Sequence, residues 1–301
     1  MEKIYSSESL KNAEKDYCGI SLMEKAAMGI ISHLEKHLDG RPLTIICGTG
    51  NNGGDGWAVA SLLKHYPVKV IFADEPKTEE SIFFRNKFDG VSISAHTQRA
   101  EDEILHSEII LDCIFGIGLC REPAGIYKKL IDLINQSKAY VVSVDTPSGV
   151  SSDCGDFLGG VISNETICIT AKKLSGVVTP TKELYGKIHT YDIGVDMSRF
   201  SPLAVVCNDE ILKFLPPRPK NSHKGSFGTL KTLCGSYYMS GAGFLSINAA
   251  LRSGVGLVKV FGEDRLLDIY KGQMFEPIYK RLSKESFIEE KASASLIGCG
   301  I

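Results

Sequence analysis

Residues 44–56 read TIICGTGNNGGDG, a short apolar run followed by a turn rich in glycine. A continuous apolar run without alternation is typical of a strand buried on both faces of a parallel sheet. Glycines let the backbone approach a ligand closely, and the free N–H groups at the start of a following helix favour a bound polar group. The stretch therefore predicts a strand–turn–helix unit of an α/β fold, with a ligand site at its turn.

The same pattern repeats along the first half of the chain. Apolar spacing predicts an earlier helix that begins near Ser21, whose hydroxyl would form a capping box with Glu24. Two later runs, 166–171 and 187–194, have no long helix between them and are interpreted as edge strands. Further strands are predicted at 68–73, 108–116 and 140–149, and helices at 56–66, 79–88 and 125–137. This alternation predicts a doubly wound, parallel, Rossmann-like sheet in a three-layer αβα arrangement.

The composition changes near residue 214, where three prolines and a basic cluster predict a linker over 214–225. A new β-α-β pattern follows within residues 226–301. A doubly wound domain usually needs about 100 residues or more to bury its sheet. We therefore expect a first domain over 1–213 and the incomplete start of a second α/β domain over 226–301.

Composition and charge argue against several classes of function. The formal net charge is −2 and the basic residues are scattered, so neither nucleic acid nor a membrane surface is an expected partner. The sequence contains no uninterrupted apolar stretch of the ~18–20 residues that a spanning helix needs. The spacing of its nine cysteines is neither that of metal ligands nor that of a disulfide framework. This predicts that the thiols are reduced, as in the cytoplasm. His33 and His37, four apart on a predicted helix, are interpreted as a partly exposed face and not as a metal site.

Three of the predicted strand ends carry an aspartate, either at the end of the strand or in the turn that follows it. These residues are Asp55, Asp112 and Asp145. Because the carboxyl ends of parallel strands meet at one edge of a sheet, they predict a shared polar site. Asn and Asp oxygens suit ribose hydroxyls, a reacting group or a hard cation. An alternative remains: the G-x-G-x-x-G spacing, with Asp74 about 20 residues further on, also fits an NAD-dependent oxidoreductase.

Three motifs in this order resemble those of the NAD(P)H-hydrate epimerase family (the YjeF N-terminal domain). They are GTGNNGGDG at 48–56, D-x-x-F-G-x-G-x-x-R at 112–121 and D-x-P-S-G at 145–149, and the similarity extends over roughly residues 1–210. The resemblance implies epimerisation of the R and S forms of hydrated NADH and NADPH, a repair of nicotinamide cofactors. It also implies a homodimer. Some members of this fold are non-catalytic binding proteins, which is a second alternative.

The resemblance also implies the residues of the site. One potassium ion per site would be held by Asn52, Asp112 and Ser148, all of which offer hard oxygen ligands. Asp145 is the expected catalytic general acid/base, helping hydroxide to leave carbon 6 of the ring before water adds again; the other proton donor is left open. The implied substrate-binding residues are Asn51, Asn52, Gly53, Gly54, Asp55, Gly116, Ile117, Gly118, Leu119, Cys120, Arg121, Glu122 and Asp145.

The second part of the chain resembles a different family. The segments HKGSFG (223–228) and ALRSGVGLV (250–258) are similar to the start of the ADP- or ATP-dependent NAD(P)H-hydrate dehydratase, which has a ribokinase-like fold. ADP or ATP would be a cofactor only if that domain were complete. We expect this fragment to lack dehydratase (lyase) activity, because the later nucleotide-binding and catalytic segment is absent.

Overall fold

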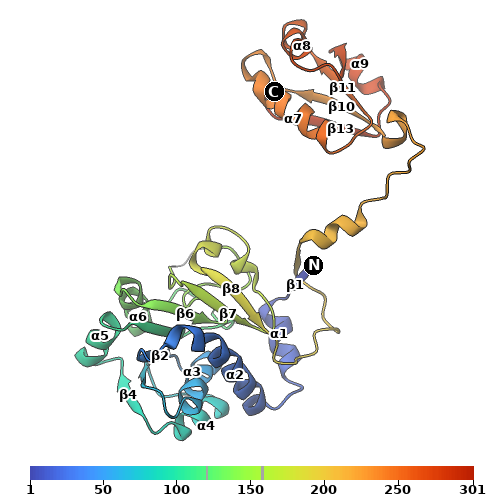
Figure 1. Ribbon diagram of the computed structural model, residues 1–301. Coiled ribbons are helices and arrows are strands. Elements are labelled where there is room, and N and C mark those ends of the chain that lie inside the picture. The colour runs from blue at the N-terminus through green and yellow to red at the C-terminus, as the bar shows by residue number, and fades with distance from the viewer. Residues whose placement is uncertain (120, 157–158) are drawn as a thin grey trace. The chain divides into compact units, whose positions relative to one another are not determined.

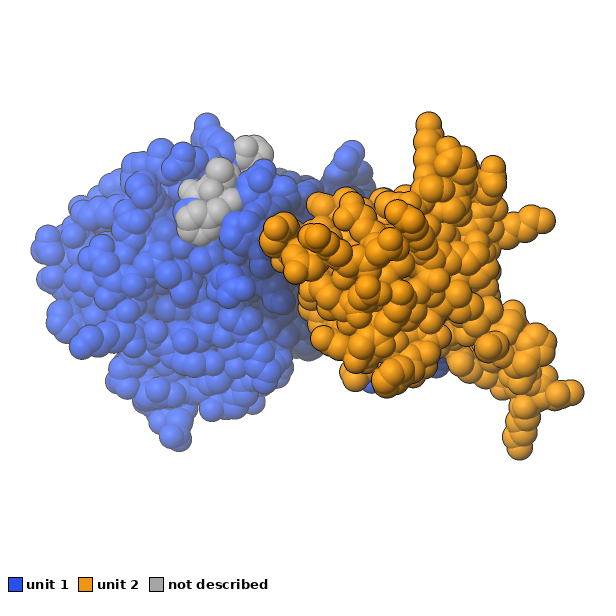
Figure 2. All heavy atoms as spheres, turned by 90° about the horizontal axis from the view of Figure 1, so that it is seen from above, with its two compact units in different colours: residues 1–214 blue, residues 215–301 orange. Residues whose placement is uncertain are grey.

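The computed structural model describes residues 1–119, 121–156 and 159–301, and the chain forms two compact units, Met1–Phe214 and Leu215–Ile301 (Figures 1 and 2). The first unit contains, in chain order, β1 (Glu2–Ile4), α1 (Ser7–Glu14), α2 (Gly19–Leu38), β2 (Leu43–Cys47), α3 (Asn51–Leu62), β3 (Val68–Phe72), α4 (Glu79–Lys87), β4 (Val91–Ser94), α5 (Gln98–Leu105), β5 (Ile109–Cys113), α6 (Ile126–Gln136), β6 (Tyr140–Val144), β7 (Glu165–Ile169), η1 (Leu174–Gly176), η2 (Thr181–Leu184), β8 (Lys187–Tyr191), β9 (Ala204–Val206) and η3 (Asp209–Phe214).

Seven parallel strands form the central sheet in the order β4-β3-β2-β5-β6-β7-β8. Strand β2 pairs with β3 on one side and with β5 on the other, so Ile46 lies between Ile71 and Asp112. The chain runs outward from β2 to β4 and then returns to the middle at β5. The strand order therefore reverses between β2 and β5, and open sheets of this kind bind ligands in the crevice at that point.

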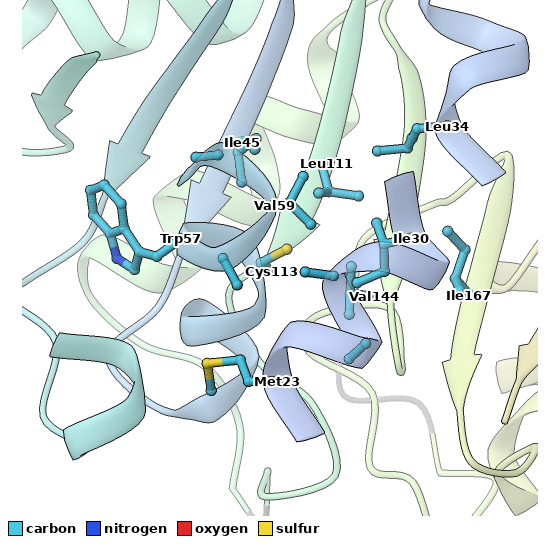
Figure 3. Packing of buried hydrophobic residues seen from close by; sticks show 14 of the residues in the cluster. Met23, Ile30, Leu34, Ile45, Trp57, Val59, Leu111, Cys113, Val144 and Ile167 are labelled. Carbon is cyan, nitrogen blue, oxygen red and sulfur yellow. The ribbon is translucent and has the colours of Figure 1, made fainter. Parts of the chain in front are cut away.

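Helices cover both faces of the sheet. Successive side chains of a strand point to opposite faces, so the apolar strands need helices on both sides to bury them. Ile45 of β2 packs in a cluster with α2, α3 and α4, and Figure 3 shows Ile30 and Leu34 of α2 in this layer. Its neighbour Ile46 packs on the other face, in a cluster with α5 and α6. Burying such a side chain contributes roughly 1.5–3 kcal/mol. The predicted doubly wound, three-layer fold is confirmed.

Two predicted helix starts are wrong. Helix α3 begins at Asn51 and not near residue 56, so the glycine-rich segment forms its first turns. Glycine has low helix propensity, but a Cβ at Gly53 would lie 2.0 Å from the carbonyl oxygen of Gly48, so close packing requires glycine there. Helix α2 begins at Gly19, which packs against Glu80 of α4, and the expected cap and capping box at Ser21 do not form.

The two strands interpreted as edge strands occupy different positions. Strand β7 lies between β6 and β8 and is buried on both faces, so only β8 is at the edge. The intervening segment crosses through short 3₁₀ turns, which explains why no long helix separates the two strands. The short elements β1, α1, β4 and α5 were not predicted.

The second unit has its own parallel sheet in the order β12-β11-β10-β13. Residues 207–221, which precede it, are all exposed. The unit confirms the predicted α/β start; its elements are η4 (Lys224–Phe227), β10 (Thr229–Cys234), η5 (Tyr237–Met239), α7 (Ser240–Arg252), β11 (Leu257–Gly262), α8 (Asp264–Lys271), β12 (Ile278–Arg281), α9 (Lys284–Glu289) and β13 (Ala294–Gly298). In the described parts of the chain, no helix combines the length and apolar character needed to cross a membrane.

Candidate active site at the strand ends

A cavity of about 410 Å³ lies at the crevice where the strand order reverses. Its walls come from α1, from the turn that begins α3, and from the segments that follow β5, β6 and β7. The predicted site residues that line it are Asn51, Asn52, Gly116, Ile117, Gly118, Leu119 and Asp145.

The other predicted site residues lie elsewhere. Gly53 and Gly54 are buried inside α3, and Asp55 lines a neighbouring cavity of about 360 Å³. Glu122 lines a smaller, separate cavity, and Arg121 is exposed. Cys120 lies outside the described residues.

Asp112 is the penultimate residue of β5, and its carboxylate is fully buried. Its Oδ1 accepts a hydrogen bond from Ser148 Oγ at 2.6 Å, and its Oδ2 accepts from Ser148 N at 2.9 Å and from Ser143 Oγ at 2.7 Å. Burial raises the pKa of Asp112, although these hydrogen bonds oppose the rise. These partners are neutral, so a buried negative charge here would be stabilised further by a cation.

The side chain of Asn52 indicates where such a cation would be held. Both its amide nitrogen and its amide oxygen are buried without a hydrogen-bond partner among the described residues. Leaving a buried polar group unsatisfied costs roughly 1–3 kcal/mol, which a ligand would relieve. The amide oxygen of Asn52, the carboxylate of Asp112 and the hydroxyl of Ser148 together are a donor set that fits a hard cation such as potassium.

Asp145 follows β6 in a left-handed conformation, with φ of 68°, which is uncommon for residues other than glycine. Its Oδ1 lies 2.6 Å from the Nζ of Lys173, and both side chains are largely buried. The ammonium also donates to the carbonyls of Ile169 and Ala171, each at 2.8 Å. Asp145 is thus held as half of a buried ion pair at the cavity wall.

Lys173 was not predicted as a site residue. A single lysine between a strand and a 3₁₀ turn carries little local signal, and its partner Asp145 lies 28 positions earlier in the sequence. The family resemblance over roughly residues 1–210 covers this lysine but implied no role for it.

Two further carboxyl groups have raised pKa values. Burial raises the pKa of Asp55 well above its ordinary range, and the charges of Asp145 and Glu14 add to the rise. Burial also raises the pKa of Glu14, with Asp145 contributing and Lys173 and Lys11 opposing. Glu14 comes from α1, which the sequence did not predict. Carboxyl groups in contrasting environments at one site are able to serve as acid and base.

Asp74, on which the oxidoreductase alternative depends, lies away from this cavity. Its carboxylate is half-exposed, accepts a hydrogen bond from Tyr127 Oη at 3.3 Å and lies 3.6 Å from His96 Nε2. Among the described residues, those that line the two large cavities do not include Asp74.

A second polar cluster lies at the opposite end of the sheet. His33 and His37 face the carboxylate of Glu165, the first residue of β7, with Nε2–Oε2 distances of 2.5 and 3.2 Å. Both rings are partly exposed, as expected from the sequence, but their contact with Glu165 was not predicted. Their i, i+4 spacing was the available signal, but the third member is more than 120 positions away.

The comparisons with known proteins agree with the motifs. A family model described as "YjeF-related protein N-terminus" matches residues 19–175, and one described as "NAD(P)H-hydrate dehydratase" matches residues 230–301. The chain is 33% identical over 183 residues to the "NAD(P)H-hydrate epimerase" of Levilactobacillus brevis, covering 58% of this chain and 83% of that protein.

Longer relatives match both units. The "Bifunctional NAD(P)H-hydrate repair enzyme Nnr" of Moorella thermoacetica is 32% identical over 83% of this chain and 51% of that protein. The protein of the same name from Escherichia coli is 30% identical over 87% of this chain and 53% of that protein. The chain therefore spans about half the length of the bifunctional relatives it matches.

The crystal structure of the yeast protein ynu0 shares the fold, with a TM-score of 0.56 at 21% identity, covering 73% of this chain and 97% of that one. The ordered motifs, the family match over more than half of the chain and the epimerase relative lead to one assignment. The chain belongs to the NAD(P)H-hydrate epimerase (YjeF N-terminal) family.

Proposed function

We propose that the first unit interconverts the R and S forms of hydrated NADH and NADPH. The observation that carries this proposal is the ion pair of Asp145 and Lys173, which shares its surroundings with the carboxyl groups of Asp55 and Glu14. Epimerisation at one carbon requires a group that gives a proton and a group that takes one. Asp145 and Glu14 line the cavity, and Asp55 lines the neighbouring cavity, which shares Glu14 and Asn51 with it.

In the proposed reaction, the bond between carbon 6 of the nicotinamide ring and its hydroxyl oxygen breaks, and the electron pair leaves with the oxygen. Asp55 gives its proton to the departing hydroxide, which leaves as water. A ring iminium cation remains, and the carboxylate of Asp145 stabilises its positive charge. Water then adds to the other face of carbon 6 while Asp145 takes its proton, and that proton returns to Asp55 through solvent.

Asn52, Asp112 and Ser148 would hold the potassium ion. When bound, the ion supplies a fixed positive charge and a position for an oxygen ligand beside the cavity. The residues themselves do the remaining work: the turn at the start of α3 lines the cavity, and Lys173 fixes the carboxylate of Asp145.

The test is the conversion of pure R-configured NADPH hydrate, followed by NMR or chromatography with and without potassium, with spontaneous epimerisation as the control. We expect rapid equilibration with the S form, faster with potassium and lost in Asp145→Asn. A wild-type rate equal to the spontaneous rate would reject the epimerase proposal. A wild-type rate in Asp145→Asn would reject only the role of that residue.

We also propose the organisation of the chain: an epimerase domain over 1–213, a linker over 214–225 and part of a ribokinase-like domain over 226–301. We propose that these residues alone do not dehydrate the substrate. In support, the bifunctional relatives are about twice as long, and β13, the last strand, is largely exposed. Formation of NADPH from the S hydrate, measured by absorbance with ADP or ATP present, would contradict this proposal.

A further inference from the structure

Three histidines and one glutamate meet at the amino end of the sheet, away from the epimerase cavity. His33 and His37 come from the last turns of α2, Glu165 begins β7, and His189 lies in β8. The Nε2 atoms of His33, His37 and His189 lie 2.5, 3.2 and 3.6 Å from the same oxygen, Oε2 of Glu165. Four side chains from three elements therefore converge on one point.

The spacing of these atoms is compatible with a bound metal ion as well as with the hydrogen bonds that His33 and His37 form with Glu165. The ligand atoms of His33, His37 and Glu165 all lie within 4.8 Å of one another. A tetrahedral zinc ion with bonds of about 2.0–2.1 Å holds its ligand atoms roughly 3.3 Å apart, so small side-chain movements would form the site. The Nε2 of His189 is buried without a hydrogen-bond partner among the described residues and lies 3.6 Å from Oε2 of Glu165, so a movement of its ring would add it as a fourth ligand.

The surroundings hold the ligands in place. The ring of His33 packs on that of His189 with centroids 4.1 Å apart, and the ring of His37 packs on Tyr140 at 4.6 Å. The carboxylate of Glu165 forms hydrogen bonds with His33 and His37, which orient it toward both rings.

Lys36 is the cation that competes for this position. Its Nζ lies 3.5 Å from Glu165 Oε2, but its side chain is 46% exposed. A long, exposed lysine side chain can turn into solvent at small cost, since surface ion pairs contribute only about 0–1 kcal/mol. Lys36 therefore does not prevent a metal ion from binding.

We propose that His33, His37, His189 and Glu165 bind a divalent transition-metal ion of the zinc class. Imidazole ligands favour zinc, cobalt, nickel and copper over potassium or magnesium. The site is distinct from the cavity, because Glu165 begins β7 and Ile169, at the cavity wall, ends it. At about 3.3 Å per residue, these two positions are about 13 Å apart. The ion would tie α2 to β7 and β8, so its effect is on stability.

The experiment is a titration of the full 301-residue chain, treated first with a chelator, with Co²⁺ and with Zn²⁺. We expect about one Co²⁺ per chain with the intense visible bands of tetrahedral coordination, and a higher Tm with Zn²⁺. His33→Gln in α2 and His189→Gln in β8 should each weaken binding at least about tenfold, since loss of even an outer-shell partner typically costs 10–100-fold. His65→Gln, an exposed histidine outside the cluster, is the matched control and should bind as the wild type does.

Three results would overturn the proposal: no tetrahedral Co²⁺ spectrum in the wild type, unchanged binding in both ligand variants, or equal loss in His65→Gln. Circular dichroism shows whether each variant is folded. If the ligand variants do not fold, the zinc X-ray absorption spectrum of the wild type decides, because it must show imidazole nitrogens around the ion. Asp145→Asn should retain the site, so its outcome is independent of the epimerase proposal.

Discussion

Lys173 is the buried cation of the cavity, with its ammonium held between Asp145 and the carbonyls of Ile169 and Ala171. Removing it leaves Asp145 as a buried charge without its partner, a change that typically costs about 3–5 kcal/mol. Lys173→Met should therefore lower the free energy of unfolding by that order and reduce epimerisation. Urea unfolding measures the first effect and the R-to-S assay the second.

The control for this prediction is the double variant Lys173→Met/Asp145→Asn. It removes both charges and should recover part of the lost stability, because no uncompensated charge remains. If Lys173→Met alone has the same midpoint of urea unfolding as the wild type, the ion pair does not contribute to stability, and the expectation from the structure is wrong.

The raised pKa of Asp55 gives a pH-dependent prediction. A group that must donate a proton works below its pKa and fails above it, so the rate should fall as the pH rises through the raised pKa of Asp55. Asp55→Asn should lower kcat by about 10²–10⁴-fold, the usual contribution of general acid catalysis. In Glu14→Gln, the epimerisation rate should still fall as the pH rises. If the fall disappears in Glu14→Gln and persists in Asp55→Asn, Glu14 is the donor.

The pKa of Glu165 predicts stability at low pH. Its pKa in the folded chain is lowered to about 2 from an ordinary value of 4.5, so its contribution is complete above 4.5 and is lost as the pH falls toward 2. The stability advantage of the wild type over Glu165→Gln should therefore shrink between pH 4.5 and 3, as measured by chemical unfolding without metal. A stability advantage that stays constant over this pH range would contradict the lowered pKa of Glu165.

Helix α3 shows how packing defines the start of an element. A Cβ at Gly53 would lie 2.0 Å from the carbonyl oxygen of Gly48, whereas a Cβ at Gly50, the residue before the helix, would meet nothing within 4 Å. Overpacking a closed site costs about 1–3 kcal/mol or more. Gly53→Ala should lower the Tm and the epimerase rate, and Gly50→Ala, one turn away, should leave the Tm nearly unchanged. Equal effects in calorimetry would show that the helix start is not tightly packed.

The same helix shows what the sequence could predict. Apolar runs such as 45–47 and 109–111 identified the buried strands, because strands in the middle of a parallel sheet are apolar on both faces. Local preference failed at α3, where glycines favour a loop until the contact with Gly48 is known. The eight-residue helices α1 and α5 and the four-residue strand β4 are too short for a clear periodic signal.

The sequence could predict those site residues that lie next to a recognisable strand end. Asp112 lies within the carboxyl end of β5 and Asp145 directly after β6, and the ends of these neighbouring strands could be predicted from the pattern. Lys173, Glu14 and the histidine cluster depend on contacts between distant segments, and a single sequence does not show such pairs. Physical chemistry recognises these groups only after folding places them together.

The whole first unit should respond to two different ions at its two ends. Potassium at Asn52, Asp112 and Ser148 would stabilise the native state by mass action, and zinc at the histidine cluster would do so independently. Sites more than about 7–10 Å apart without shared ligands usually contribute additively. We therefore expect calorimetry to give Tm increments for potassium and zinc that add within error when both are present. Asp112→Asn should remove only the potassium increment and His189→Gln only the zinc increment. If either substitution removed both increments, the two sites would be coupled, and their independence would be wrong.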